Sequence, residues 1–258
     1  GIFAETRVVR NASGLFDVSH MGRIRITGNE AASLLNWIVT ANVPALKINQ
    51  ARYTLICTKS GFVLDDGIVY RLDQEEYLLI CNAANRHQVW QCLTSWSIRQ
   101  FRNTKLEDCT LEMSMIAFQG PNTPKVMDNL APNITDKLKP FHCTSSQIGG
   151  IPALVARTGY TGEEGFEIMP SAKDASKLWE ILEKSGAAPC GLGARDVLRL
   201  EAGLLLHGTD MDKYCSPFEA GLDRFVYLNK QSVASTALSQ IAAEGVSKKL
   251  VGFQLLER

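Results

Sequence analysis

The chain has 258 residues, of which 45% are hydrophobic and 21% are charged, and 27 basic side chains balance 27 acidic ones. This length predicts two compact domains, and the zero net charge gives no reason to expect a nucleic acid or a membrane as partner. No apolar run approaches the roughly 20 residues that cross a bilayer, and the start has no signal-peptide pattern. The seven cysteines form no CxxC pair and the four histidines show no ligand spacing, so we expect reduced thiols and no metal site.

Hydrophobic periodicity in the first hundred residues predicts strands and helices in a definite order. Two of the strands flank a Lys-Ser-Gly turn and should form a hairpin, and Asn29 should cap the first helix. The order strand, helix, strand, strand, strand, helix is typical of an α+β fold with an antiparallel sheet. The expected elements are a strand at 22–27, a helix ending near 38, strands at 51–58, 62–71 and 77–81, and a helix from 85 to about 97.

The second half of the chain predicts a similar mixture of antiparallel strands and flanking helices. The expected elements are a strand at 111–118, a helix through 125–127, an irregular segment at 140–150, a strand pair at 151–157 and 165–169, helices at 172–184 and 194–202, and a last strand at 249–255.

Two adjacent carboxylates, Asp65 and Asp66, lie between apolar runs. In an alternating strand they should point to opposite faces, so that one of them faces the interior. A carboxylate is costly there unless it is hydrogen-bonded, and such groups often serve a function. The alternative is a simple turn at Asp66-Gly67.

The glycine-rich segment 157–167 ends with Glu167 between two apolar residues. A carboxylate in that setting suits a pterin, whose 2-amino group and N3–H form an adjacent pair of donors. A phosphate loop is the rival interpretation, but no Gly-Lys-Ser/Thr follows and the segment is acidic. Further along, Arg195 lies at the expected start of a helix, where it suits a carboxylate such as the tail of a folate, or is only a surface residue beside Asp196.

The segment 16–22 is a polar cluster inside apolar sequence. The adjacent side chains of Ser19 and His20 diverge, so they cannot act as a catalytic pair, and His20 is more consistent with a structural hydrogen-bonding role. Met21 offers a soft apolar surface to an aromatic ligand.

Taken in order, these segments resemble the glycine cleavage system T protein family, the tetrahydrofolate-dependent aminomethyltransferases. The resemblance spans residues 14–222, and its seven motifs together are specific. The matching stretches are 14–22 (GLFDVSHMG), 65–70 (DDGIVY), 82–85 (NAAN), 117–121 (AFQGP), 157–167 (RTGYTG and GFE), 191–202 (GLGARD and RLEA) and 217–222 (PFEAGL).

The resemblance implies a ring-like multidomain architecture with folate at its centre and the catalytic residue Asp66 near N5 and N10. Glu167 corresponds to the pterin anchor and Arg195 to a residue near the tail, and no metal is implied. The implied folate-binding residues are Met21, Tyr53, Asp66, Tyr70, Asn82, Tyr160, Glu167 and Arg195.

The resemblance also implies a domain division: residues 1–22 with 106–245 form the first folate-binding domain, 23–105 a second α+β domain, and 246–258 the start of a C-terminal β domain. About thirty preceding residues and most of that barrel domain would lie outside this sequence. Residues 222–225 and 229–235 depart from the family pattern, and we expect them to lie away from the folate motifs.

The implied reaction releases ammonia from the aminomethyl-lipoyl arm of the H protein and forms 5,10-methylene-tetrahydrofolate. The expected compartment is the cytoplasm in a bacterium or archaeon and the mitochondrial matrix in a eukaryote. Two alternatives stay open. One is a folate-dependent demethylase of a small methylated substrate, and the other is a non-enzymatic folate-binding factor of iron–sulfur cluster assembly.

Overall fold

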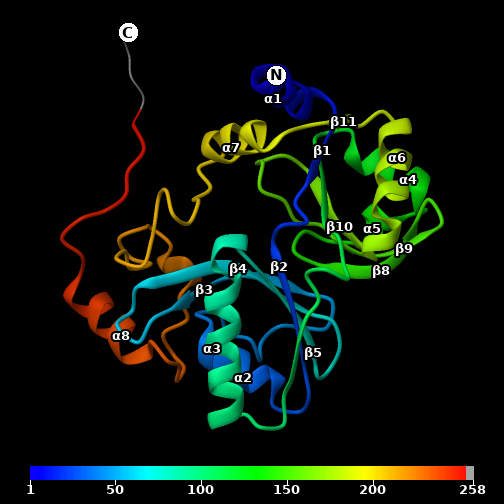
Figure 1. The fold of residues 1–258 in the computed structure, drawn as a ribbon. Coiled ribbons are helices and arrows are strands. Elements are labelled where there is room, and N and C mark those ends of the chain that lie inside the picture. The colour runs from blue at the N-terminus through cyan, green and yellow to red at the C-terminus, as the bar shows by residue number, and fades with distance from the viewer. Residues whose placement is uncertain (254–258) are drawn as a thin grey trace.

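The protein consists of two β-sheets flanked by helices (Figure 1). The computed structural model describes residues 1–253. The strands are β1 (Gly14–Asp17), β2 (Gly22–Thr27), β3 (Ala51–Cys57), β4 (Val63–Arg71), β5 (Glu76–Cys81), β6 (Lys105–Asp108), β7 (Ile116–Gln119), β8 (Cys143–Ile148), β9 (Ile151–Ala156), β10 (Gly165–Pro170) and β11 (Ala188–Pro189). The helices are α1 (Ile2–Asn11), α2 (Ala31–Ile38), α3 (Arg86–Arg99), α4 (Thr123–Leu130), α5 (Ile134–Lys137), α6 (Ala175–Lys184), α7 (Leu192–Glu201) and α8 (Ser235–Glu244), with short 3₁₀ turns η1 (Ala83–Asn85), η2 (Ala172–Asp174) and η3 (Asp223–Phe225).

The first sheet has the strand order β11-β1-β7-β10-β9-β8 and is antiparallel except where β1 pairs with β11. The second sheet, β3-β4-β5-β2-β6, is antiparallel throughout. In Figure 1, α4, α5 and α6 lie beside the first sheet, and α2 and α3 beside the second. This arrangement confirms the α+β fold class with antiparallel sheets and flanking helices.

The second sheet and its two helices share one hydrophobic core. Leu34 and Leu35 of α2 and Leu93 of α3 are fully buried against strand residues such as Ile24 and Val69. Burying side chains of this size is worth about 2 kcal/mol each before the entropy cost. The helices therefore form where apolar residues recur at helical spacing over the sheet.

Residues 204–245 cross from α7 to the β3–β4 hairpin. Leu222 and Leu238 of this crossing segment pack with Leu55 and Val63 of the hairpin. Lys230 Nζ donates to the carbonyl oxygens at the end of α2, including that of Asn36 at 2.7 Å, where a cation also suits the helix dipole. The predicted domain boundaries and the three-domain ring stay predictions.

Several local expectations differ from the structure. Asn29 does not cap α2, which begins after Glu30, and the Glu30 carboxylate instead accepts from the Asn103 N–H at 2.7 Å. Residues 140–150 are not irregular, because β8 pairs there with β9. The strand expected at 111–118 is reduced to β7. Residues 249–253 form no strand, and the last two residues of that expected strand lie outside the described residues.

None of the helices in residues 1–253 combines the length and apolarity that crossing a bilayer requires.

Candidate functional site

The two adjacent carboxylates lie in the middle of β4, which is flanked by β3 and β5. Asp65 is completely buried and Asp66 is 9% exposed, so both carboxylates are interior, rather than one as expected from alternation. The turn alternative is wrong, because Gly67 continues the strand and pairs with Cys81. A Cβ at Gly67 would lie 2.1 Å from the carbonyl oxygen of Ile80, so glycine is required for β5 to approach here.

Asp66 is held by hydrogen bonds to both of its carboxylate oxygens. The Tyr53 phenol donates to Oδ2 at 2.8 Å, and the Asn82 amide donates to Oδ1 at 2.7 Å. Burial raises the pKa of Asp66, and these two donors act in the opposite direction. The result is an oriented carboxylate that holds its proton more readily than an exposed one.

Asp65 accepts three hydrogen bonds from two asparagines. Asn82 donates its main-chain N–H to Oδ2 at 3.1 Å and its amide to Oδ1 at 2.8 Å, and the Asn85 amide also donates to Oδ1, at 2.7 Å. Burial raises the pKa of Asp65 to about 6, although these donors oppose the shift. Because the Asn82 amide donates to both acids, it links their positions.

Glu167, on β10 of the first sheet, is buried and paired with two hydroxyl groups. Thr158 Oγ1 donates to its Oε2 at 2.5 Å, and the Tyr70 phenol donates to the same oxygen at 3.4 Å. Within the described residues no donor bonds to Oε1, which leaves that oxygen free to accept from a ligand. Tyr70 also comes from β4, four residues after Asp66, so the two Cα atoms are about 13 Å apart on one face of the strand.

The glycine-rich loop between β9 and β10 is held by the fully buried side chain of Gln119. Its amide nitrogen donates to the carbonyl oxygen of Thr158 at 3.2 Å, and its oxygen accepts from Thr161 Oγ1 at 2.9 Å. A Cβ at Gly159 would lie 2.0 Å from Gln119 Oε1. The glycine therefore makes room for the amide that positions Thr158, rather than for a phosphate.

Tyr160 and Arg195 stack beside the anchor. The Arg195 guanidinium carbon is 4.8 Å from the Tyr160 ring centroid, and the Tyr160 phenol donates to the carbonyl oxygen of Leu205 at 2.5 Å. Burial lowers the pKa of Arg195, while the nearby charge of Glu167 raises it. Nη1 of Arg195 is buried and has no hydrogen-bond partner in the described part of the chain, which makes it a candidate donor to a ligand.

Met21 packs against the cluster of buried residues that contains Tyr70. Its loop is shaped by the fully buried Arg23, whose guanidinium donates to the carbonyl oxygens of Met21 at 2.6 Å and Ser19 at 2.9 Å. His20 is exposed and makes no side-chain hydrogen bond within residues 1–253, so its expected structural role is wrong.

Comparison with known proteins assigns the fold that carries this site. A family model described as the GCVT N-terminal domain matches residues 1–230. The chain is 39% identical over 267 residues to the aminomethyltransferase of Symbiobacterium thermophilum, covering 100% of this chain and 71% of that protein. The chain belongs to the aminomethyltransferase family.

A second relative and a solved structure support the same family assignment. The chain is 42% identical over 245 residues to the aminomethyltransferase of Streptomyces avermitilis, covering 93% of this chain and 65% of that protein. It is similar to the crystal structure of the glycine cleavage system aminomethyltransferase T from Bartonella henselae, with a TM-score of 0.88 and 32% identity over 96% of this chain and 68% of that one. The chain thus spans about two thirds of the length of the relatives it matches.

The family resemblance identified most of the residues that gather here, but three contacts were missed. Thr158 donates to Glu167, and Asn85 donates to Asp65 although it was expected only to open a helix. The Phe225 ring packs edge-on against Tyr53, with ring centroids 4.7 Å apart. The expectation that residues 222–225 lie away from the folate motifs is therefore wrong. Thr158 and Glu167 lie within one motif and Asn85 and Asp65 in neighbouring ones, so motif membership gave a signal for these two contacts, whereas nothing in the sequence pointed to the long-range contact between Phe225 and Tyr53.

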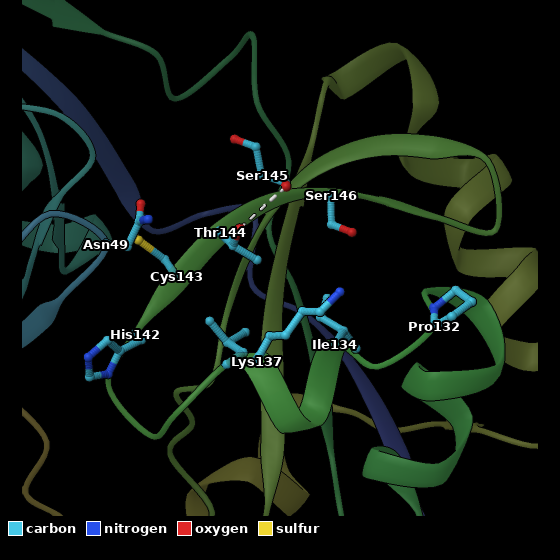
Figure 2. Close-up of a pocket in the computed structure, with 10 residues that line it drawn as sticks. Asn49, Pro132, Ile134, Lys137, His142, Cys143, Thr144, Ser145 and Ser146 are labelled. Carbon is cyan, nitrogen blue, oxygen red and sulfur yellow. Dashed lines mark hydrogen bonds between the residues drawn. The ribbon is translucent and has the colours of Figure 1, made fainter.

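A surface cavity of about 340 Å³ lies between β8 and α5 (Figure 2). Its polar lining includes Asn49, Lys137, His142 and Ser146. It contains none of the eight residues that the aminomethyltransferase resemblance implied. We place the candidate site at Asp66 and Glu167, because both carboxylates are buried and Arg195 Nη1 has no hydrogen-bond partner within residues 1–253.

Within residues 1–253, no three His, Cys, Asp or Glu side chains gather in a way that could hold a metal ion.

Proposed function

We propose that the chain binds a reduced folate between Glu167 and Asp66 and acts as a tetrahydrofolate-dependent aminomethyltransferase of glycine cleavage. The observation that carries the proposal is the pair of buried carboxylates, Glu167 and Asp66, which β4 links through Tyr70. Membership of the aminomethyltransferase family supports the reaction.

Glu167 is proposed as the anchor of the pterin. Thr158 and Tyr70 both donate to Oε2, which fixes the carboxylate while Oε1 keeps its lone pairs. A carboxylate so held accepts from two neighbouring N–H donors, and the pterin 2-amino group and N3–H form such a pair. Tyr160 and Met21 supply flat and soft apolar surfaces for a ring system.

Arg195 is proposed as a donor to an oxygen of the same ligand. The resemblance puts this residue near the folate tail, but its stacking on Tyr160 and its electrostatic interaction with Glu167 favour the pterin end. The orphaned Nη1 fits a folate in either case, because both the pterin ring and the tail carry oxygen acceptors.

Asp66 is proposed to act at the reacting nitrogens of folate. Its two oxygens are already oriented by Tyr53 and Asn82, and each keeps a further lone pair for a ligand N–H. A fixed negative charge there stabilises the positive charge that develops as the C–N bond to the departing ammonia breaks. Its raised pKa also suits transient acceptance of a proton from a folate nitrogen.

The proposed donor is the aminomethyl-lipoyl arm of the H protein, and tetrahydrofolate receives the methylene group to give 5,10-methylene-tetrahydrofolate. The chain's own contribution is to hold the acceptor in position, which converts the transfer into a reaction between oriented groups. The proposed compartment is the cytoplasm, since the relatives named above come from bacteria.

The test supplies tetrahydrofolate and compares two kinds of donor. We expect ammonia and 5,10-methylene-tetrahydrofolate to form only with aminomethylated H protein. Full turnover with sarcosine, dimethylglycine or a methylated sulfonium compound, without H protein, would instead identify a demethylase. Tight folate binding with no turnover from either kind of donor would identify a binding protein.

A further inference from the structure

His207 lies in the loop that follows α7, between the carboxylate pair and the glycine-rich loop. The position of the loop is fixed at Asp210, whose Oδ2 accepts from the Leu206 N–H at 2.9 Å and from the buried guanidinium of Arg199. Two residues before His207, the carbonyl oxygen of Leu205 accepts from the Tyr160 phenol. The short segment 205–210 therefore contacts Tyr160 of the glycine-rich loop, and His207 in the same segment contacts Asn85, the donor to Asp65.

Both ring nitrogens of His207 are engaged by the protein. Nδ1 lies 2.9 Å from the Asn85 amide nitrogen, and Nε2 lies 3.4 Å from the carbonyl oxygen of Val63 at the start of β4. His207 thus touches both the strand that carries Asp65 and Asp66 and the residue that donates to Asp65.

The hydrogen-bond partners determine the tautomer of His207. Asn85 must direct its NH₂ group, not its oxygen, toward Asp65, because an ionised carboxylate only accepts. The second hydrogen of that NH₂ then points to His207 Nδ1, which must accept. The ring proton therefore sits on Nε2 and is donated to the carbonyl oxygen of Val63.

From Asn85 the chain of hydrogen bonds continues to the proposed reacting carboxylate. Asp65 Oδ1 accepts from Asn85 and from Asn82, and the Asn82 amide also donates to Asp66 Oδ1 at 2.7 Å. Without an acceptor at position 207, the second N–H of Asn85 loses its partner, and the Asn85 amide is free to rotate. Asp65 and Asn82 then lose part of the restraint that orients Asp66.

We propose that His207 is a positioning residue for Asp66, acting through Asn85, Asp65 and Asn82. This inference rests on the proposed function, because it concerns the efficiency of the same carboxylate. His207 makes no hydrogen bond to Asp66, and both of its ring nitrogens are occupied. Its role is therefore orientation rather than proton transfer.

The test compares His207→Leu with His207→Asn in the full chain, because Asn and Leu have similar shapes but only Asn carries an acceptor in the place of Nδ1. We expect His207→Leu to lower kcat about tenfold, as small displacements of reacting groups commonly do, with little change in the KM for tetrahydrofolate. His207→Asn should recover most of the loss. The matched control is His87→Leu on the exposed face of α3, which should keep wild-type kcat.

A double-mutant cycle with Asn85→Ala tests the route of action. If His207 acts through Asn85, the double variant loses no more kcat than Asn85→Ala alone. Additive losses, or equal kcat for His207→Leu and wild type, would overturn the inference while leaving the proposed function in place. Failure of the proposed function is separate, because the wild-type protein itself would then give no methylene-tetrahydrofolate from aminomethylated H protein.

Discussion

Tyr53 and Asp66, on the neighbouring strands β3 and β4, are joined by a hydrogen bond of 2.8 Å from the phenol to Oδ2 of the carboxylate. Burial and the charge of Asp66 both raise the pKa of Tyr53, so the phenol keeps its proton and remains the donor. Phe225 packs against the same ring in a T-shaped arrangement and restricts its movement. The carboxylate proposed to react is therefore oriented from β3 as well as from Asn82.

Removal of the phenol tests this contact. Tyr53→Phe should lower kcat by roughly tenfold, equivalent to about 1.4 kcal/mol, because a charge-assisted hydrogen bond that orients Asp66 is lost. Steady-state kinetics with aminomethylated H protein measure the change. Tyr77→Phe is the matched control, since Tyr77 is buried in the same sheet and its hydroxyl has no partner among the described residues. Equal kcat values for the two variants would contradict the role of Tyr53.

Turnover should fall as the pH drops below about 6, because burial raises the pKa of Asp65 to about 6. Protonated Asp65 no longer accepts all three bonds from Asn82 and Asn85, and the orientation of Asp66 is lost. The apparent pKa of the activity profile belongs to the coupled pair Asp65–Asp66. The titratable side chain of His207 is linked to this pair by the Asn85 amide. A kcat profile that stays flat down to pH 5 would contradict this assignment.

The same shift has the opposite effect on folding stability. The pKa of Asp65 in the folded state, about 6, lies above its ordinary value of 3.8. Its stabilising contribution is therefore complete below pH 3.8 and is lost as the pH rises through 6, a difference of roughly 3 kcal/mol at pH 7. The acidic limb of the activity profile should thus appear in protein that is still folded, which circular dichroism across the same pH range checks.

Glu167→Gln tests the pterin anchor. The amide keeps one oxygen for Thr158 and Tyr70 but replaces Oε1 with a donor that opposes the pterin N–H groups. Tetrahydrofolate affinity measured by calorimetry should weaken by about 2 to 3 kcal/mol. Glu164→Gln is the control, because Glu164 lies three residues before Glu167 but is exposed and pairs with Arg157. Unchanged affinity for Glu167→Gln would remove the anchor role.

Arg195→Gln separates the pterin end from the tail. Because Arg195 stacks on Tyr160 and senses the charge of Glu167, the variant should weaken tetrahydrofolate and tetrahydropteroate equally. Tetrahydropteroate lacks the glutamate tail, so a loss confined to tetrahydrofolate would instead assign Arg195 to the tail. Paired calorimetric titrations with the two ligands give the answer.

Local pattern predicted the parts of the fold in which each strand carries its own signal. The strand at Gly22–Thr27 and the hairpin of β3 and β4 follow from alternation and a Lys-Ser-Gly turn. The strand β8 was missed because its Thr, Ser and Gln residues form an edge with no apolar alternation, and its pairing with β9 supplies the order. Sheet pairing decides such segments, and it is not visible in a short window.

The site was predictable only as a set of residues, not as a set of contacts. Family resemblance supplied Asp66, Tyr53 and Asn82, whereas local pattern left Asp66 open to interpretation as a turn. No rule of spacing joins His207 to Asn85, which are 122 positions apart. Long-range hydrogen bonds of this kind depend on how the crossing segment packs on β4, so only the folded structure reveals them.

Asp66→Asn tests the central claim most directly, with turnover and tetrahydrofolate affinity measured on the same preparation. The amide keeps an oxygen for Tyr53 but removes the negative charge at the proposed reacting nitrogens. We predict that methylene-tetrahydrofolate formation from aminomethylated H protein falls on the order of a hundredfold or more, while calorimetric affinity stays close to that of the wild type. Turnover near the wild-type rate in a variant that still binds tetrahydrofolate would contradict the assignment of Asp66 to the reacting end of the folate.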